Sequence, residues 1–123
     1  MGLQISIRES GDVTILDLCG RATMNDGESE SLKRQLQELM AQGADKLLLN
    51  LADLRQIDST GLSVIAKTCA RLRDQGGDLR FLRPRGAALA AFKVLRLLEV
   101  ILTFEDENQA LASFRPLRKF AKP

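Results

Sequence analysis

The sequence contains no histidine, and its two cysteines, Cys19 and Cys69, lie far apart. Histidine is the side chain that most often acts as a general acid or base in catalysis. Two widely separated cysteines do not have the close spacing of zinc ligands. The sequence also lacks a glycine-rich loop followed by lysine, which would cradle phosphate groups. We therefore expect a protein that is not an enzyme and that binds no metal or cofactor.

Two weaker patterns could still indicate catalysis or phosphate transfer. Lys67 follows Ser59 by about two helical turns, which is a poor placement for the contact that a Ser-Lys hydrolase needs. Asp53 follows an apolar segment, as the phosphate-accepting aspartate of a response regulator would. However, the first expected strand is not followed by the acidic pair that would hold a metal ion there. Neither pattern predicts an enzyme.

Long apolar segments are also absent. No run approaches the ~18 residues that a membrane-spanning helix requires, and the amino terminus lacks the basic-then-apolar layout of a signal peptide. We therefore expect a cytoplasmic protein without a membrane span. Cys19 and Cys69 each lie in an apolar pattern, so we expect both to be buried free thiols.

Charge is unevenly distributed along the chain, although the net charge is only +2. Residues 1–30 are mainly acidic, and residues 71–123 are mainly basic. The basic residues are interleaved with acids and apolar positions, which indicates solvated faces rather than a nucleic-acid patch. We expect protein partners of mixed charge and no direct binding of nucleic acid.

The hydrophobic periodicity predicts alternating strands and helices in one domain of 123 residues. An initial hairpin joins residues 3–7 to residues 13–19 through a turn at residues 10–12. The first helix has Asn25 or Asp26 as its cap, an apolar stripe that includes Leu32 and Met40, and Gly43 as its stop signal. The later elements are expected as strand 47–51, helix 61–75, strand 78–83, helix 86–98, strand 100–104 and helix 107–114.

The expected order is therefore ββαβαβαβα, which defines the α/β class. Strands that alternate with helices imply crossover connections, and these give a mainly parallel sheet of four to five strands flanked by helices. The hairpin adds an antiparallel element and makes the sheet mixed. We expect the domain to cover residues 1–114 and to be followed by a basic tail of residues 115–123.

A hydroxyl-rich turn, Ile57-Asp58-Ser59-Thr60-Gly61-Leu62, connects the central strand region to the second helix. Serine and threonine commonly accept hydrogen bonds from the exposed N–H groups of a helix start, so the turn has an ordinary structural explanation. Thr60 is the expected cap. Asp58 could orient the Ser59 hydroxyl, contribute to a partner surface, or accept backbone hydrogen bonds as a turn residue. Gly61 is expected to permit a tight helix start or the close approach of a partner backbone.

The same turn, together with the preceding Asn50-Leu51-Ala52-Asp53-Leu54, resembles the signature of the STAS domain family, in particular its anti-sigma factor antagonists. The resemblance covers nearly the whole chain, because the expected order of elements also follows that of the family. In these antagonists, a partner that is both anti-sigma factor and serine kinase phosphorylates the serine after the aspartate. The resemblance implies that Ser59 is this phosphorylation site.

The resemblance also implies where the partner binds. The expected partner-binding residues are Asp58, Ser59, Thr60, Gly61, Leu62 and, in the loop after the second strand, Thr23. A phosphate at Ser59 would weaken docking through its charge and strong solvation. The resemblance leaves open whether the protein forms a homodimer. It also leaves open whether the domain is instead a scaffold or accessory subunit of a stress-sensing or lipid-transport complex.

The sequence departs from the family pattern at two places. Many antagonists have an aspartate shortly after the glycine that ends the second strand, whereas this chain continues from Gly20 with Arg21-Ala22-Thr23. A Ser-Gly or Thr-Gly pair often separates the third helix from the last strand, and Arg96-Leu97 stands there in this chain. These positions could therefore change partner choice.

Overall fold

The structure is a computed structural model, which describes residues 2–23 and 27–115. Its strands are β1 (Leu3–Ser10), β2 (Val13–Ala22), β3 (Lys46–Ile57), β4 (Asp78–Leu82) and β5 (Thr103–Phe104). Its helices are α1 (Glu28–Ala41), α2 (Ser59–Asp74), α3 (Gly86–Val94) and α4 (Glu107–Ser113), with a 3-10 turn, η1 (Leu97–Glu99), between α3 and β5. The predicted order and α/β class are confirmed.

All five strands form one sheet in the order β1-β2-β3-β4-β5. The β1–β2 hairpin is antiparallel, and the other neighbouring strands are parallel. Each parallel step is made through a helix, because parallel neighbours need a crossover connection and not a tight turn. The mixed, mainly parallel sheet that the sequence predicts is therefore confirmed.

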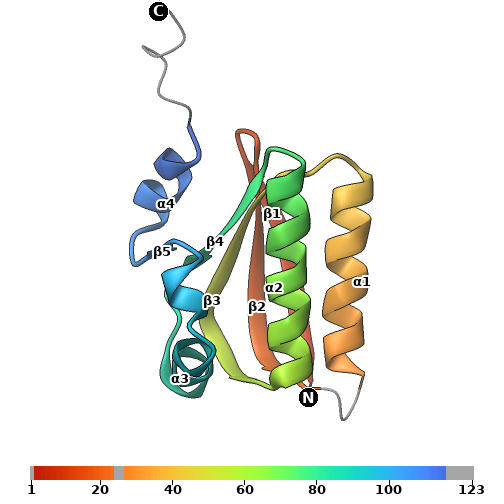
Figure 1. The fold of residues 1–123 in the computed structure, drawn as a ribbon, viewed down its shortest axis with the longest axis vertical. Helices are drawn as coiled ribbons and strands as arrows, with labels where there is room; N and C mark the ends of the chain where they lie inside the picture. The colour runs from red at the N-terminus through yellow and green to blue at the C-terminus, as the bar shows by residue number, and fades with distance from the viewer. Residues whose placement is uncertain (1, 24–26, 116–123) are drawn as a thin grey trace, which may run out of the picture.

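Helices cover the two faces of this sheet unequally (Figure 1). The larger apolar cluster joins one face to α1, α2 and α3 and contains, among others, Leu16, Leu36, Ile65 and Phe92. The smaller cluster joins the other face to the short helix α4, through residues such as Ile15, Leu48, Ala110 and Phe114. The apolar run of β3 is explained by this arrangement, because alternate leucines enter opposite clusters.

The expectation that both cysteine thiols are buried is wrong for Cys19. Cys69 is buried in α2, but Cys19 is exposed. Along β2, Leu16 and Leu18 face the larger cluster, while Val13 and Ile15 face α4. Cys19 lies on the same face as Ile15 but farther along the strand, and a helix of only seven residues does not cover that part of the sheet.

Several element ends also differ from the sequence expectation. β3 continues beyond Leu51 to Ile57, because its second half pairs with β2 as far as Ala22. The third helix ends at Val94 rather than at residue 98, and Arg96 then adopts a left-handed conformation with φ 60°. The last strand is shortened to Thr103–Phe104. The first helix stops at Ala41 before Gly43, as predicted.

None of the helices in the described part of the chain has the length and apolar composition that crossing a bilayer would need.

Candidate functional site

The candidate site is the corner where β3 ends and α2 begins. Asp58 is the N-cap of α2: its backbone is extended, and its carboxylate Oδ1 accepts a hydrogen bond from the N–H of Gly61 at 2.9 Å. This bond satisfies one of the N–H groups that lack a partner at the start of a helix. The expectation that Thr60 is the cap is therefore wrong, because Thr60 already lies within the first helical turn.

Ser59 is the first residue of α2, and its side chain is exposed. Thr60 is exposed as well, whereas Asp58 is half-buried. Two neighbouring hydroxyl groups are thus accessible to a second protein, while the carboxylate between sheet and helix is held in place. A negatively charged group at Ser59 would also lie near the positive end of the α2 dipole, where an anion is tolerated.

Gly61 and Leu62 lie beneath this corner. A Cβ atom at Gly61 would come within 2.7 Å of Ile57 Cγ1 and 3.0 Å of the Ala22 carbonyl oxygen. Glycine is therefore required for the close contact between α2 and the ends of β2 and β3. Leu62 is only 5% exposed and belongs to the larger apolar cluster. Both residues shape the corner from below rather than present side chains to solvent.

Thr23 lies beside the Asp58 corner. The Asp58 N–H donates to the Ala22 carbonyl at 3.2 Å, immediately before Thr23. The N–H of Ser29 donates to the Thr23 carbonyl at 3.0 Å, and the Ser29 hydroxyl donates to Asp58 Oδ1 at 3.3 Å. The end of β2 and the starts of α1 and α2 are thereby joined by hydrogen bonds.

Sequence reasoning missed two residues of this arrangement, Glu28 and Ser29. Both are buried, and the Thr23 hydroxyl donates to Glu28 Oε1 at 2.9 Å. Ser29 precedes Leu32 by three residues and therefore continues the apolar stripe of α1 by one turn, a signal that could have revealed its burial. The N-cap of α1 is Gly27, and the proposed caps Asn25 and Asp26 lie outside the described residues.

The Asn50 that begins the family-like segment lies away from this corner, in the middle of β3. Its amide donates to Asp17 Oδ1 at 2.7 Å, and its own oxygen accepts from the N–H of Ala52 at 3.2 Å. Asp17 is also paired with Arg8, whose guanidinium lowers the pKa of this carboxyl group. Asn50 therefore stabilises the sheet and is separate from the hydroxyl-bearing turn.

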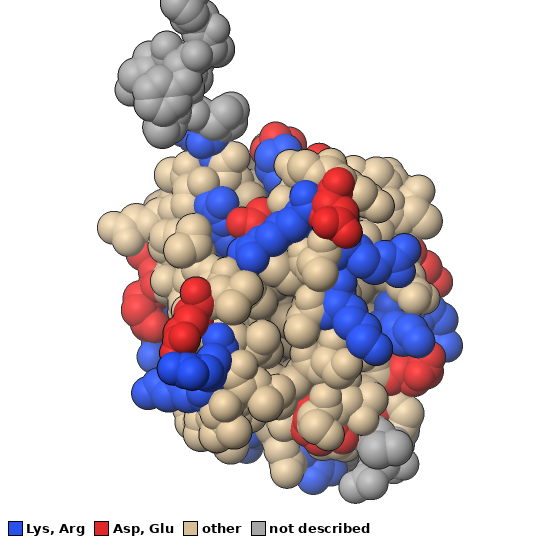
Figure 2. All heavy atoms as spheres, in the orientation of Figure 1, with Lys and Arg blue, Asp and Glu red and all other residues tan. Residues whose placement is uncertain are grey.

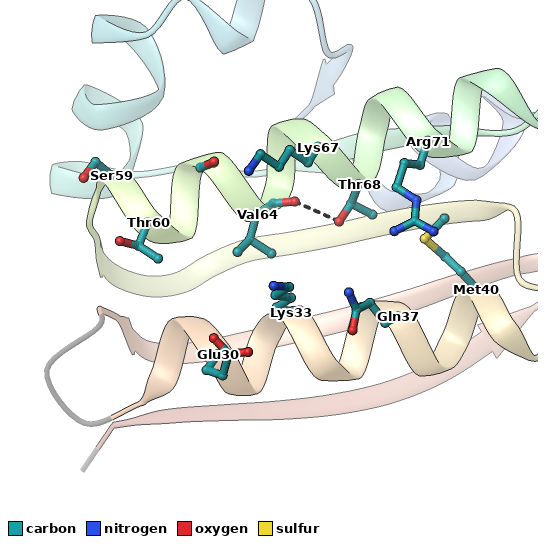
Figure 3. A pocket seen from close by; sticks show the side chains of 11 residues that line it. Glu30, Lys33, Gln37, Met40, Ser59, Thr60, Val64, Lys67, Thr68 and Arg71 are labelled. Carbon is teal, nitrogen blue, oxygen red and sulfur yellow. Dashed lines mark hydrogen bonds between the residues drawn. The ribbon is translucent and has the colours of Figure 1, made fainter.

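The described residues contain no group of three His, Cys, Asp or Glu side chains placed to hold a metal ion. Ser59 and Thr60 instead line one end of an open groove of about 410 Å³ between α1 and α2 (Figure 3). The arrangement therefore places two exposed hydroxyl-bearing residues on a hydrogen-bonded corner next to a groove. This geometry suits the docking of another protein.

A family model described as the STAS domain matches residues 4–110. Among solved structures, a Thermotoga maritima protein with a proposed anti-sigma factor antagonist role is 20% identical, with a TM-score of 0.83 over 91% of this chain and 95% of that chain. The phosphorylated form of the Bacillus cell fate determinant SpoIIAA is 18% identical, with a TM-score of 0.69 over 93% and 100% of the two chains.

A murine anion transporter, Solute Carrier 26 family member A9, is also similar. It is 16% identical, with a TM-score of 0.68 over 86% of this chain and 18% of the transporter. At these identities the likenesses establish the fold alone.

Proposed function

Because this chain belongs to the STAS domain family, we propose that it is an anti-sigma factor antagonist that a partner anti-sigma factor with serine kinase activity switches off by phosphorylating Ser59. It would regulate transcription indirectly, by binding this partner and not DNA. The observation that carries the proposal is the exposed Ser59 hydroxyl at the first position of α2, directly after a fixed aspartate cap.

The position of Ser59 supports a switch that acts on binding and leaves the fold intact. A phosphate would add about −1.5 to −2 charges at neutral pH. Because Ser59 is exposed at a helix start, this charge meets water and backbone N–H groups and no apolar packing. At an interface, however, the same group would clash with an acidic or dry partner surface. We expect phosphorylation to weaken docking while the domain stays folded.

The proposed docking surface consists of Asp58, Ser59, Thr60 and the neighbouring Thr23, with Gly61 and Leu62 supporting it from below. The hydrogen bonds through Ser29 hold Asp58 and Thr23 at fixed relative positions. A preorganised surface loses little conformational entropy when a partner binds.

The alternative proposal is that the domain is a scaffold or accessory subunit, of a stress-sensing or a lipid-transport complex. The likeness to part of the murine transporter supports this alternative, since the same fold occurs there within a larger chain. In that case the Ser59 corner would be a constant interface. A kinase gene beside the gene for this protein would favour the switch, and a transporter operon would favour the subunit.

The proposed function is tested by incubating the protein with its candidate anti-sigma kinase and ATP and mapping phosphate by mass spectrometry. We expect one phosphate on Ser59, none in Ser59→Ala, and unchanged modification in the control Thr60→Val. Affinity for the partner should fall by one to two orders of magnitude on phosphorylation, equivalent to about 1.4 to 2.8 kcal/mol. Ser59→Asp should bind more weakly than Ser59→Ala.

Phosphate on Thr60 alone would contradict the assignment of Ser59. A partner that binds but never phosphorylates the protein would favour the scaffold alternative.

A further inference from the structure

The groove between α1 and α2 has a chemical character that the proposed switch does not explain. The two helices lie side by side on the same face of the sheet (Figure 1), and side chains of both line the groove between them (Figure 3). It is lined along α2 from Ser59 to Arg71, which corresponds to about 18 Å at the helical rise of ~1.5 Å per residue. A groove of this length is better matched to a chain segment than to a compact ion.

Three cations line this groove: Lys33 from α1 and Lys67 and Arg71 from α2. The close view places Lys33 and Arg71 on facing helices, with the Arg71 guanidinium directed toward α1 (Figure 3). Lys and Arg side chains also gather over the two helices on the molecular surface (Figure 2). None of the three cations forms an ion pair or hydrogen bond with the described part of the chain.

This cluster has little compensating negative charge nearby. Glu30 is the only acidic residue among the described residues that line the groove. Three cations along one concave surface concentrate positive potential there, so an anionic ligand is attracted. The half-buried side chains of Met40 and Val64 lie in the same groove and offer apolar contact between the charges.

We propose that the α1/α2 groove binds an acidic segment of the protein partner, with carboxylates against Lys33, Lys67 and Arg71 and an apolar side chain against Met40 and Val64. This inference rests on the proposed function for the identity of the partner. It also gives the switch a physical basis: a phosphate on Ser59 adds negative charge at the end of the groove, where it repels the acidic segment.

The chemistry can be tested without the partner. The probe is a labelled peptide of about twelve residues, rich in glutamate and with leucine at helical spacing, and its lysine-substituted counterpart is the matched probe. Fluorescence anisotropy should show that the acidic peptide binds and that its lysine-substituted counterpart does not. The affinity for the acidic peptide should fall as the salt concentration is raised. The variant Lys33→Glu/Arg71→Glu should bind it at least about tenfold more weakly, because two attractions become repulsions.

The control variant is Arg34→Glu/Lys93→Glu, which reverses two exposed cations that do not line the groove. It should bind the acidic peptide nearly as the unchanged protein does. Because Lys33 and Arg71 are exposed, the groove variant should fold normally, which urea unfolding checks; the milder Lys33→Gln/Arg71→Gln gives an independent measurement. Absence of acidic-peptide binding, equal loss in both variants, or equal binding of the basic peptide would overturn the proposal.

Measuring the affinity of each variant for the partner then distinguishes failure of the groove proposal from failure of the proposed switch. If Ser59→Asp weakens partner binding while Lys33→Glu/Arg71→Glu does not, the groove proposal is wrong and the switch at Ser59 stands. If the acidic peptide binds in the groove but no kinase modifies Ser59, the groove proposal stands and the proposed switch fails. Loss of partner affinity in both variants, with the control variant unaffected, supports both.

Discussion

At the scale of single residues, Gly61 lies too close to β2 and β3 to be replaced by a larger residue without a loss of stability. Gly61→Ala should lower the free energy of unfolding by about 1–3 kcal/mol, because its Cβ would overlap Ile57 and the Ala22 carbonyl. Urea unfolding measures the loss, and Ser63→Ala, a half-buried position on the same helix, should change stability far less. An alanine variant as stable as the unchanged protein would show that the ends of β2 and β3 can move apart at little cost.

The two cysteines provide a second prediction at this scale. In native protein, Cys19 should react at once with a thiol reagent, while Cys69 should react only after denaturant is added. Burial raises the pKa of the Cys69 thiol, so less of the reactive thiolate forms at neutral pH. Cys19→Ser should remove the fast phase and Cys69→Ala the slow one. Two fast phases, or none, would contradict the placement of these side chains.

At the scale of elements, the segment after α3 is shaped by an unfavourable backbone conformation. Arg96 has φ 60°, a left-handed conformation that glycine adopts most readily, and connects α3 to η1. Its side chain pairs with Glu99 at 3.2 Å, but both groups are well exposed, so this ion pair contributes little.

Arg96→Gly should therefore be more stable than Arg96→Ala by about 1 kcal/mol, because both lose the ion pair and only glycine adopts the left-handed conformation without strain. Thermal unfolding of the two variants, compared directly, measures this difference. Equal stability would mean that the segment leaves the left-handed region when the side chain is shortened.

At the scale of the whole molecule, Arg8 connects the first hairpin to the last helix. Its guanidinium pairs with Asp17 of β2 at 2.7 Å and with Glu107 of α4 at 2.7 Å. These contacts lower the pKa of both carboxyl groups and raise the pKa of Arg8. The cluster lies on the face covered by α4, opposite to the face that holds the α1/α2 groove.

This cluster predicts how stability depends on pH. Because the folded pKa values of Asp17 and Glu107 lie below the unfolded values of about 3.9 and 4.3, the unfolded chain binds protons first as the solution is acidified. The stabilisation is present above about pH 5 and is lost as the pH falls through the folded pKa values. Arg8→Met should flatten this dependence, as followed by urea unfolding at several acidic pH values. Arg21→Met, which changes an exposed arginine elsewhere on β2, should retain it.

The order of elements and the position of the hydroxyl-bearing turn were determined by the sequence itself. Apolar periodicity distinguishes helix from strand locally. The nearly continuous apolar run of residues 47–51 indicates a strand that is covered on both faces of the sheet. Turn residues such as Gly11 and Gly43 then mark where elements stop. The family-like segment placed Ser59 at a helix start, and the structure has it at the first position of α2.

Only the tertiary structure decided which residues of the sheet are covered by helices and which side chains from distant segments lie close together. Cys19 is exposed because α4 is too short to reach it, and the length of a covering helix is invisible in the strand's own pattern. Asp58, rather than Thr60, caps α2 because the extension of β3 along β2 sets where the chain turns. Lys33 and Arg71 share one groove because α1 and α2 pack side by side, a contact between segments that local periodicity does not encode.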